Sequence, residues 1–339
     1  MTLARRQSGL SLIELMVSMT LGLIVLSGVL VVFVNSSAAR NEVERTTRQI
    51  ENGRYASELL TDDLRVAGFW GQLDPTTVAT PAALPADPCS LTVADWNAWL
   101  PVHIQGYDAA SFTSTNCALT NYKAGTDVLV IRRARTCSAN ATTCTPNVTA
   151  GTPYLQVSLC ATQVTKYVLD VYPSSGTAPF DMQTKACDAT LANKREYYVH
   201  IYYIATDNGR GDSVPTLKRL ELVGGTTPSW STVPLVEGIE NLQLLYGVDT
   251  NNDGVPDEYV ANPTTLARWM NVVTTQFFVL ARNLESSQNY SDTKTYTLGK
   301  DASGTAITYT PSGSDVGYRR HVYSGLVRIM NPAGRRDTP

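Results

Sequence analysis

Histidines and recognisable catalytic motifs are rare in this chain of 339 residues. The three histidines, His103, His200 and His321, lie far apart in the sequence, and no GxSxG, HExxH or phosphate-loop pattern is present. His200 falls within a segment of alternating apolar and polar residues, where we expect a half-buried structural side chain. The usual sequence signs of an enzyme are therefore missing.

An excess of positive charge is also missing. The chain has 27 Lys and Arg against 30 Asp and Glu, and its formal net charge is −3. A protein of this charge is poorly suited to contact phosphates, so we do not expect nucleic acid to be its main partner. Hydrophobic residues make up 43% of the chain, which is enough for a globular core in the part that follows Gly68.

The most informative feature that is present is a long apolar run at residues 10–34, directly after a short basic leader. At about 1.5 Å per residue, this run forms roughly 37 Å of helix, enough to cross a bilayer core of about 30 Å. Glu14 interrupts the run, although a carboxylate costs roughly 2.5–3.5 kcal/mol at the centre of a membrane. Arg5 and Arg6 precede the run, so we expect a cytoplasmic N-terminus and an exported remainder.

A secretory signal peptide is the first alternative. Its apolar core has about 7–15 residues, and its cleavage site follows the core after small residues. Residues 36–39, Ser-Ser-Ala-Ala, mimic such a site. However, the apolar run is longer than the core of a signal peptide and contains a carboxylate. A second alternative, a plain signal-anchor helix, requires neither Gly9 nor Glu14 at these positions.

The arrangement around Gly9 resembles the N-terminus of type IV prepilins and pseudopilins. Residues 11–16, Ser-Leu-Ile-Glu-Leu-Met, match the motif of that family, with Glu14 as the fifth residue after Gly9. The resemblance implies that prepilin peptidase cleaves between Gly9 and Leu10 and that the Leu10 amine is methylated. Leu10 stands where the family most often has phenylalanine. The resemblance also implies that Glu14 attracts the N-terminal amine of an adjoining subunit during assembly.

Six cysteines lie beyond the apolar run, in the part expected to be exported. None forms a CxxC pair, and no histidine lies near one at zinc-ligand spacing, so an oxidising compartment and disulfides are expected. Six cysteines allow 15 pairings, and the sequence leaves the choice open. Neighbour pairing closes the shortest loops and is our weak preference: Cys89–Cys117, Cys137–Cys144 and Cys160–Cys187.

The residue pattern predicts an α+β fold with one long N-terminal helix and antiparallel sheets. The resemblance to prepilins implies that this fold is pilin-like, with the helix packed on the sheets. Apolar residues at steps of three and four predict that the helix continues to residue 67, with Gly53 as a weak point. Residues 74–121 are rich in Pro, Ala, Thr and Asn, and we expect little regular structure there. Strand-like runs without intervening helices follow, which favours antiparallel pairing. They are residues 127–133, 154–160, 164–172, 196–206, 217–223, 235–248, 270–282 and 322–330.

These features divide the chain into four parts. Residues 1–9 form the leader, 10–34 the transmembrane part of the helix, and 35–67 its periplasmic part. Residues 68–339 form the exported β-rich domain.

The order of later features resembles the PilW family of minor pilins and, more distantly, the GspJ-type minor pseudopilins. The stretches that carry the resemblance are residues 54–71, 235–243, 246–249 and 319–323. It implies an inner-membrane protein that helps to prime or cap type IV pilus assembly and reaches the pilus tip or surface. The implied partners are other minor pilins, the major pilin, prepilin peptidase, the inner-membrane assembly platform and a tip adhesin. A pseudopilin of a type II secretion system is the alternative, and a membrane-tethered enzyme or binding protein is a weaker one.

One loop, residues 249–257, has the spacing of a calcium-binding loop. The candidate Ca²⁺ ligands are the side chains of Asp249, Asn251, Asp253 and Asp257, together with the Val255 carbonyl. The acidic residue expected at position 12 of such a loop is absent, because Val260 stands there. An Asx-rich hairpin turn explains the same residues without a metal, and both explanations remain open.

Overall fold

A computed structural model describes residues 11–108, 111–140 and 147–336 of this chain. The chain divides into two compact units, Met1–Arg48 and Gln49–Pro339. The described part of the first unit is almost wholly helical. The second unit contains every strand found among the described residues.

Helix α1 (Leu12–Arg65) begins in the first unit and ends in the second. It confirms the predicted long helix to within two residues at each end. Gly68 follows the last turn with a φ of 67°, the left-handed conformation that glycine adopts readily at helix ends. Within the second unit, the buried residues of α1 recur every three or four positions and form one face. They are Gln49, Gly53, Ala56, Leu60, Asp63 and Leu64.

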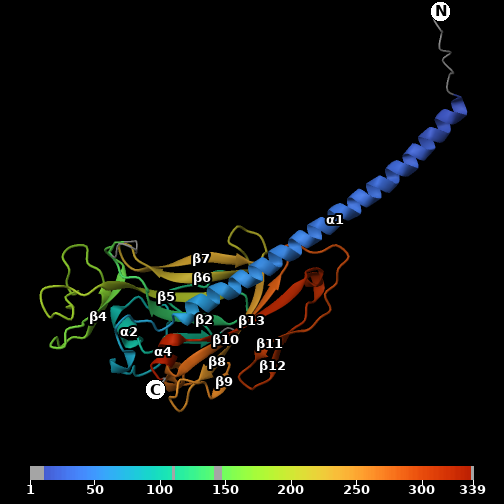
Figure 1. The fold of residues 1–339 in the computed structure, drawn as a ribbon. Coiled ribbons are helices and arrows are strands. Elements are labelled where there is room, and N and C mark those ends of the chain that lie inside the picture. The colour runs from blue at the N-terminus through green and yellow to red at the C-terminus, as the bar shows by residue number, and fades with distance from the viewer. Residues whose placement is uncertain (1–10, 109–110, 141–146, 337–339) are drawn as a thin grey trace, which may run out of the picture. The chain divides into compact units, whose positions relative to one another are not determined.

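The larger of the sheets has seven strands, all paired antiparallel (Figure 1). Its main order is β1-β2-β5-β3-β4, and β6 joins β5 while β7 joins β6. The strands are β1 (Ile104–Tyr107), β2 (Val128–Ala134), β3 (Pro153–Val157), β4 (Tyr167–Val171), β5 (Lys194–Ala205), β6 (Thr216–Val223) and β7 (Ser229–Glu237).

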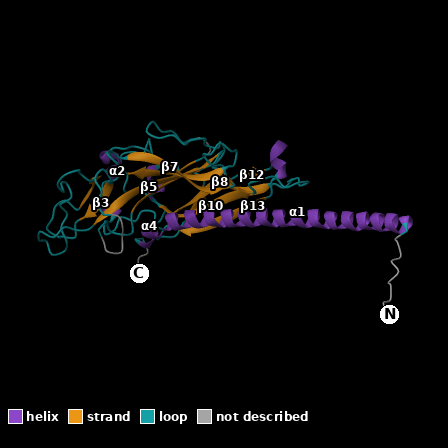
Figure 2. Cartoon of the chain, turned by 90° about the horizontal axis from the view of Figure 1, so that it is seen from above, coloured by secondary structure: helices purple, strands orange, loops and turns teal. Residues whose placement is uncertain are grey.

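A second antiparallel sheet has the order β13-β10-β8-β9, and a separate hairpin joins β11 to β12. The C-terminal part of α1 lies along β10 and β13 of this sheet (Figure 2). The strands are β8 (Ile239–Val248), β9 (Glu258–Val260), β10 (Val272–Arg282), β11 (Tyr296–Lys300), β12 (Ala306–Tyr309) and β13 (Arg320–Arg328). Short helices complete the unit: η1 (Pro75–Thr77), α2 (Val93–Ala98), α3 (Leu266–Met270), η2 (Gly313–Gly317) and α4 (Met330–Gly334).

Two hydrophobic clusters lie on opposite faces of the seven-stranded sheet. Tyr202 and Ile204 of β5 belong to the cluster that also contains Leu60 and Leu64 of α1. Residues at odd positions of the same strand, such as Tyr203, belong to a cluster with Trp70 and Trp96. Because side chains alternate along a strand, β5 supplies both clusters and is buried on both faces.

The expectation of little regular structure in residues 74–121 is wrong in part. This stretch contains η1, α2 and strand β1. Thr92 caps α2 with its side chain, and Trp96 anchors the helix by donating its indole N–H to the Ser90 carbonyl at 2.8 Å. Short elements of this kind are held by burial of a few large side chains, which composition does not reveal.

Two strand predictions also need correction. The run at residues 235–248 is divided between β7 and β8 at Gly238, where φ is 79° and a side chain would lie 2.8 Å from the Arg282 carbonyl. The hairpin β11–β12 was not predicted at all. Leu298 and Ile307 are the only large aliphatic residues in its two strands, so the sequence lacks a strong period-two signal there.

Candidate functional site

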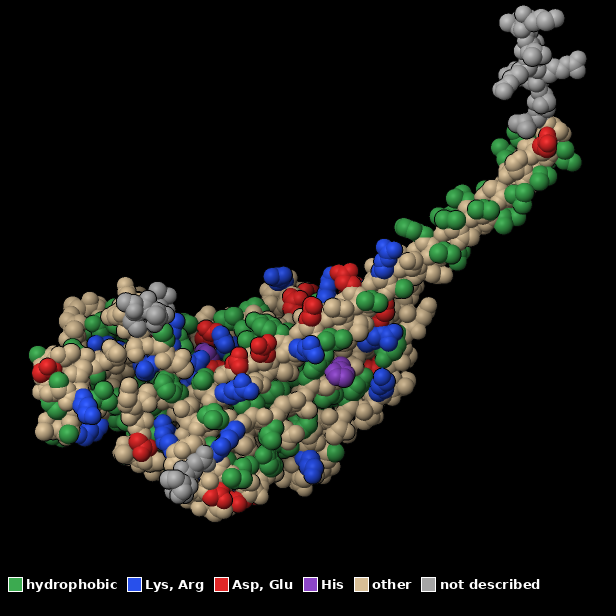
Figure 3. All heavy atoms as spheres, in the orientation of Figure 1, with side chains coloured by type: hydrophobic (Ala, Val, Ile, Leu, Met, Phe, Trp, Pro, Cys, Tyr) green, Lys and Arg blue, Asp and Glu red, His purple; other side chains and the backbone are tan. Residues whose placement is uncertain are grey.

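The first unit presents an exposed apolar helix. Among the described residues, α1 is the helix that is long and apolar enough to cross a membrane, with a mean hydropathy of 2.6 in its qualifying window and none of that window buried. Hydrophobic side chains gather along this part of α1 in Figure 3. The hydroxyls of Ser18, Thr20 and Ser27 donate to backbone carbonyls one turn earlier, which satisfies them within the helix.

Glu14 is the exception in this apolar surface. Its Oε2 accepts a hydrogen bond from the Ser11 backbone N–H at 3.1 Å, so the carboxylate folds back over the first turn. The N–H groups of a first turn lack partners within the helix, and the positive end of the helix dipole favours a negative charge there. Gly9 and Leu10, the predicted cleavage and methylation residues, lie outside the described residues.

Within the second unit, polar side chains fix the end of α1 to the sheets. The Gln49 side-chain amide donates to the carbonyls of Ala281 (3.0 Å) and Arg319 (3.1 Å). The Asn52 amide donates to the Glu237 carbonyl at 3.0 Å. Because these carbonyls belong to the second unit's strands and loops, α1 is held by directional bonds as well as by apolar burial.

Asp63 is the centre of a buried polar cluster beneath α1. Its Oδ1 accepts from Arg133 Nε at 2.7 Å, and its Oδ2 lies 2.6 Å from His200 Nδ1 and 2.8 Å from the Tyr202 hydroxyl. Burial alone would raise the pKa of Asp63, but the charges and hydrogen bonds of His200 and Arg133 outweigh it and hold the pKa below the usual 3.8. The cluster shows His200 to be a structural partner of α1.

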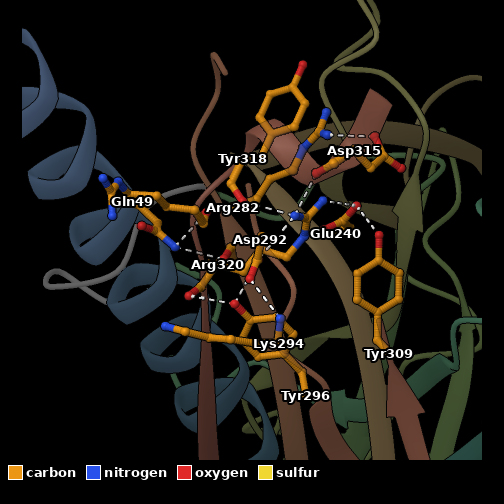
Figure 4. Close-up of polar contacts among 12 residues, drawn as sticks. Gln49, Glu240, Arg282, Asp292, Lys294, Tyr296, Tyr309, Asp315, Tyr318 and Arg320 are labelled. Carbon is orange, nitrogen blue, oxygen red and sulfur yellow. Dashed lines mark hydrogen bonds and ion pairs between the residues drawn. The ribbon is translucent and has the colours of Figure 1, made fainter. Parts of the chain in front are cut away.

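A second buried network joins the hairpin β11–β12 to the four-stranded sheet (Figure 4). Arg320 Nε donates to Glu240 Oε2 at 2.6 Å, and the Tyr309 hydroxyl donates to Glu240 Oε1 at 2.8 Å. Asp292 accepts from the Tyr296 hydroxyl at 2.8 Å and lies 3.4 Å from Arg320 Nη1. Since both carboxylates and the guanidinium are buried, each depends on the others for compensation of its charge.

Residues of the candidate calcium loop are brought together in a turn. The Asp249 carboxylate accepts from the backbone N–H groups of Asn252 and Gly254 and from Arg336 Nη1 at 3.0 Å. Asp253 accepts from the Val255 N–H at 2.8 Å. Asp257 Oδ2 accepts from the N–H and the hydroxyl of Thr250, each at 2.7 Å. Among the described residues, no group of three or more His, Cys, Asp or Glu side chains is arranged to hold a metal ion.

Two of the preferred cysteine pairs are disulfides in the structure. Cys89–Cys117 and Cys160–Cys187 have Cα–Cα distances of 5.8 Å and 4.9 Å, within the usual range. The third preferred pair includes Cys144, which lies outside the described residues.

Comparison with known families assigns both ends of the chain. Residues 4–30 match the prokaryotic N-terminal methylation motif. Residues 201–331 match the family described as type IV pilus-assembly protein W. Together, the two matches support a type IV pilin of the PilW family. Searches of curated proteins and of solved structures found no match.

The segment matched to the PilW family contains the whole four-stranded sheet, the hairpin β11–β12 and the buried pair Glu240–Arg320. The motif at the N-terminus contains Glu14. Gln49 and Asp63, which fix α1 to the sheets, lie outside both matched segments. We did not predict these two residues from the sequence. The signal that could have revealed them is a polar residue at a position where the helical period predicts burial.

Proposed function

We propose that this PilW-family pilin is a minor pilin that helps to prime or cap type IV pilus assembly at the inner membrane and then occupies the pilus tip. The observation that carries the proposal is Glu14, the one charged residue in the exposed segment 12–34 of α1. A helix that served only as an anchor gains nothing from a buried charge.

The proposed mechanism begins with removal of residues 1–9 at the cytoplasmic face. Cleavage after Gly9 creates an α-amine on Leu10, whose reference pKa is near 8, so that it carries a positive charge at neutral pH. Glu14 of one subunit then attracts the amine of the next as its helix leaves the membrane. In a medium of low dielectric constant, this pairing offsets the cost of burying either charge alone.

The second unit supplies the specific contacts in this proposal. Hydrogen bonds from Gln49 and Asn52, together with the Asp63 cluster, hold the end of α1 on the sheets. The globular domain therefore remains fixed to the part of α1 that packs on it. We infer that its exposed faces contact other minor pilins and a tip adhesin.

Substitution of Glu14 tests this mechanism. Glu14→Ala and Glu14→Gln both remove the charge, and the second preserves the size of the side chain. We expect cleavage and membrane insertion to remain intact, because loss of a charge eases insertion. We expect surface piliation and co-purification with other pilins to be lost in both variants.

Glu44→Gln is the matched control for this experiment. Glu44 is an exposed carboxylate of the same helix that pairs with Arg48 one turn later, outside the apolar run. It should leave piliation unchanged. Wild-type piliation and partner capture in both Glu14 variants would refute the intersubunit role. Co-purification with secretion components in place of pilus components would favour the pseudopilin alternative.

A further inference from the structure

Strand β13 forms one margin of the four-stranded sheet and pairs with β10 in one continuous register. Along such a strand, the backbone N–H and C=O groups of successive residues point to opposite sides. Just beyond one end of the strand, the Ile329 N–H donates to the Val273 carbonyl at 2.8 Å. At the other end, the Arg319 carbonyl accepts from the Asn283 N–H at 3.0 Å. The backbone groups of odd-numbered residues therefore point to β10, and those of even-numbered residues point away from the sheet.

The outward-pointing backbone groups of β13 lie on Val322, Ser324 and Leu326. Among the described residues, none of these N–H and C=O groups has a hydrogen-bond partner. Ser324 is exposed, and the Leu326 side chain is 60% exposed. A row of donors and acceptors with the spacing of a strand is complementary to one kind of ligand, another polypeptide strand.

Helix α1 covers a face of β13 and leaves this edge uncovered. The ring of Tyr323 packs against Gly53 of α1, and Val327 belongs to the hydrophobic cluster that α1 shares. Both are odd-numbered, so α1 lies over the face that the odd side chains form. Ile50, one turn before Gly53, is still 42% exposed. A strand added at the edge would therefore have exposed aliphatic surface on both sides, from Ile50 and from Leu326.

The other margins of the two larger sheets are short or protected. Strand β7 contains Pro234 and a shift of register, and the Leu169 carbonyl of β4 accepts from the Asn97 side chain at 2.8 Å. Strands β1 and β9 have only four and three residues. Strand β13 has nine residues, without proline or a register shift. Because proteins usually protect long edges against unwanted pairing, an unprotected one indicates a docking site.

The charge around the edge indicates the chemistry of its partner. Residues 316–336 contain five arginines and no Asp or Glu, and Arg319 and Arg328 stand at the two ends of the open stretch. Burial raises the pKa of Tyr323, and the positive charge of Arg54 in α1 opposes this rise, so Arg54 lies near the same strand. Carboxylates on a partner strand would complement these charges. A second copy of β13 would bring arginines together without any carboxylate, which disfavours self-pairing.

We propose that the free edge of β13 receives an extended segment of a partner polypeptide, in which aliphatic side chains are flanked by carboxylates. The segment adds a fifth strand to the four-stranded sheet. Backbone hydrogen bonds to Val322, Ser324 and Leu326 supply affinity, and the side chains around the edge select the aliphatic and acidic residues. This inference concerns the second unit alone and does not depend on the proposed role of Glu14.

The probe is the peptide acetyl-Glu-Val-Thr-Ile-Thr-Val-Glu-amide, added to the full chain in micelles of a nonionic detergent. Two matched peptides test its chemistry. In the first, methyl groups replace the amide hydrogens of the three central residues, and in the second, lysine replaces both glutamates. Isothermal titration calorimetry should show saturable binding of the probe below about 1 mM. Each matched peptide should bind at least about tenfold more weakly, because it loses backbone hydrogen bonds or charge attraction.

Deuterium exchange, resolved to single amides by mass spectrometry, locates the bound peptide. The amides of Ser324 and Leu326 should exchange rapidly in the free protein and at least about tenfold more slowly with saturating probe. The amides of Tyr323 and Val327, which are bonded to β10, should be protected in both states. Such alternation distinguishes addition of a strand from contact with side chains alone.

A pair of variants at Ser324 separates the backbone from the side chain. Ser324→Pro removes one outward donor and keeps the bonds to β10, because an edge strand tolerates proline where its nitrogen faces away from the sheet. Ser324→Ala changes the same side chain and keeps the donor. Ser324→Pro should abolish binding of the probe, and Ser324→Ala should bind it as the wild type does. If Ser324→Pro does not fold, the exchange pattern and the methylated peptide still decide the question with the wild type.

Alternating protection, together with binding that methylation and lysine both weaken, supports the proposal. It is overturned if the probe does not bind up to about 5 mM, if the methylated peptide binds equally, or if Ser324 and Leu326 gain no protection. Equal binding of the lysine peptide would overturn the acidic character of the partner. Protection of these two amides that rises with protein concentration, without any peptide, would assign the edge to a second copy and would also overturn the proposal.

Discussion

At the scale of single residues, close packing and buried polar contacts determine how α1 meets the sheets. Gly53 illustrates the first. Any side chain at this position would overlap the ring of Tyr323 in β13. The sequence marked Gly53 as a weak point of the helix, because glycine is a poor helix former. The structure shows instead that the missing side chain allows β13 to approach.

Replacement of Gly53 by alanine separates the effect of helix propensity from the effect of close packing against β13. In an exposed helix, Gly→Ala stabilises by about 1 kcal/mol. Here we expect Gly53→Ala to lower the free energy of unfolding by about 1 kcal/mol, because overpacking displaces the Tyr323 ring. Thermal or denaturant unfolding of the chain in micelles measures this change.

The same substitution in a Tyr323→Ala background is the control. Without the ring, alanine at position 53 should be neutral or stabilising, so the double-mutant cycle should show a coupling of about 1 kcal/mol or more. Equal effects of Gly53→Ala in both backgrounds would contradict the proposed contact.

Some residues could be predicted from the sequence and others could not. Glu14 was evident because a charge in an apolar run has few explanations. Arg320 lay in a recognised stretch, but nothing in the sequence connected it to Glu240, eighty residues away, or to Asp292. Long-range polar pairs of this kind depend on the final register of β8, β10 and β13, which local patterns do not specify.

At the scale of elements, prediction was most reliable where one period extends over many residues. Helix α1 and the long strand β5 follow from their patterns. The pattern failed at Gly238, where one apolar run continues through two strands, and at the hairpin β11–β12, whose strands contain few large aliphatic residues. Both failures arise because tertiary contacts determine those conformations.

The loop at residues 249–257 still carries an untested prediction. If it binds Ca²⁺, the melting temperature of the chain should rise with calcium, because a ligand that binds only the folded state stabilises it. The expected affinity is about 10⁻⁴–10⁻³ M, typical of extracellular sites. Asp253→Ala should abolish the increase. Differential scanning calorimetry in EDTA and in excess calcium measures it.

Asp301→Ala is a suitable control, since Asp301 accepts hydrogen bonds from Ser303 and Thr305 in the turn of the β11–β12 hairpin. It should leave any calcium response unchanged. Identical melting of the wild type in EDTA and in calcium would show that loop 249–257 is only a turn.

At the scale of the whole molecule, the described core combines two disulfides, two hydrophobic clusters and several buried charges. The buried titratable groups make stability depend on pH. Burial lowers the pKa of His103 from 6.5 to about 4. The pKa values of Asp63 and Glu240 are also lowered, because their basic partners outweigh the effect of burial.

Acid should therefore destabilise the protein in two stages. His103 binds a proton more readily in the unfolded chain than in the folded protein, so protonation favours unfolding. The free energy of unfolding is therefore unaffected by His103 above pH 6.5 and falls by up to about 3 kcal/mol as the pH is lowered toward 4. The ionised carboxylates of Asp63 and Glu240 stabilise the folded protein at pH values above their pKa in the unfolded chain. This stabilisation is lost progressively below about pH 4.5. Denaturant unfolding from pH 8 to 3.5 should show both stages.

His103→Gln should remove the first stage and leave the second. His321→Gln, at an exposed histidine, should preserve both stages. The comparison uses the slope of stability against pH, so it remains informative if His103→Gln is less stable at every pH. An unchanged slope between pH 6.5 and 4 in His103→Gln would rule out His103 as the cause.

We propose that this chain is processed as a prepilin and incorporated into a pilus. Mass spectrometry of the N-terminal peptide from sheared, purified pili tests it most directly. We expect the chain to be recovered with the pili and its first residue to be Leu10 with a methylated amine. Recovery only in the membrane fraction, with an N-terminus at Met1 or near Ala38, would contradict it.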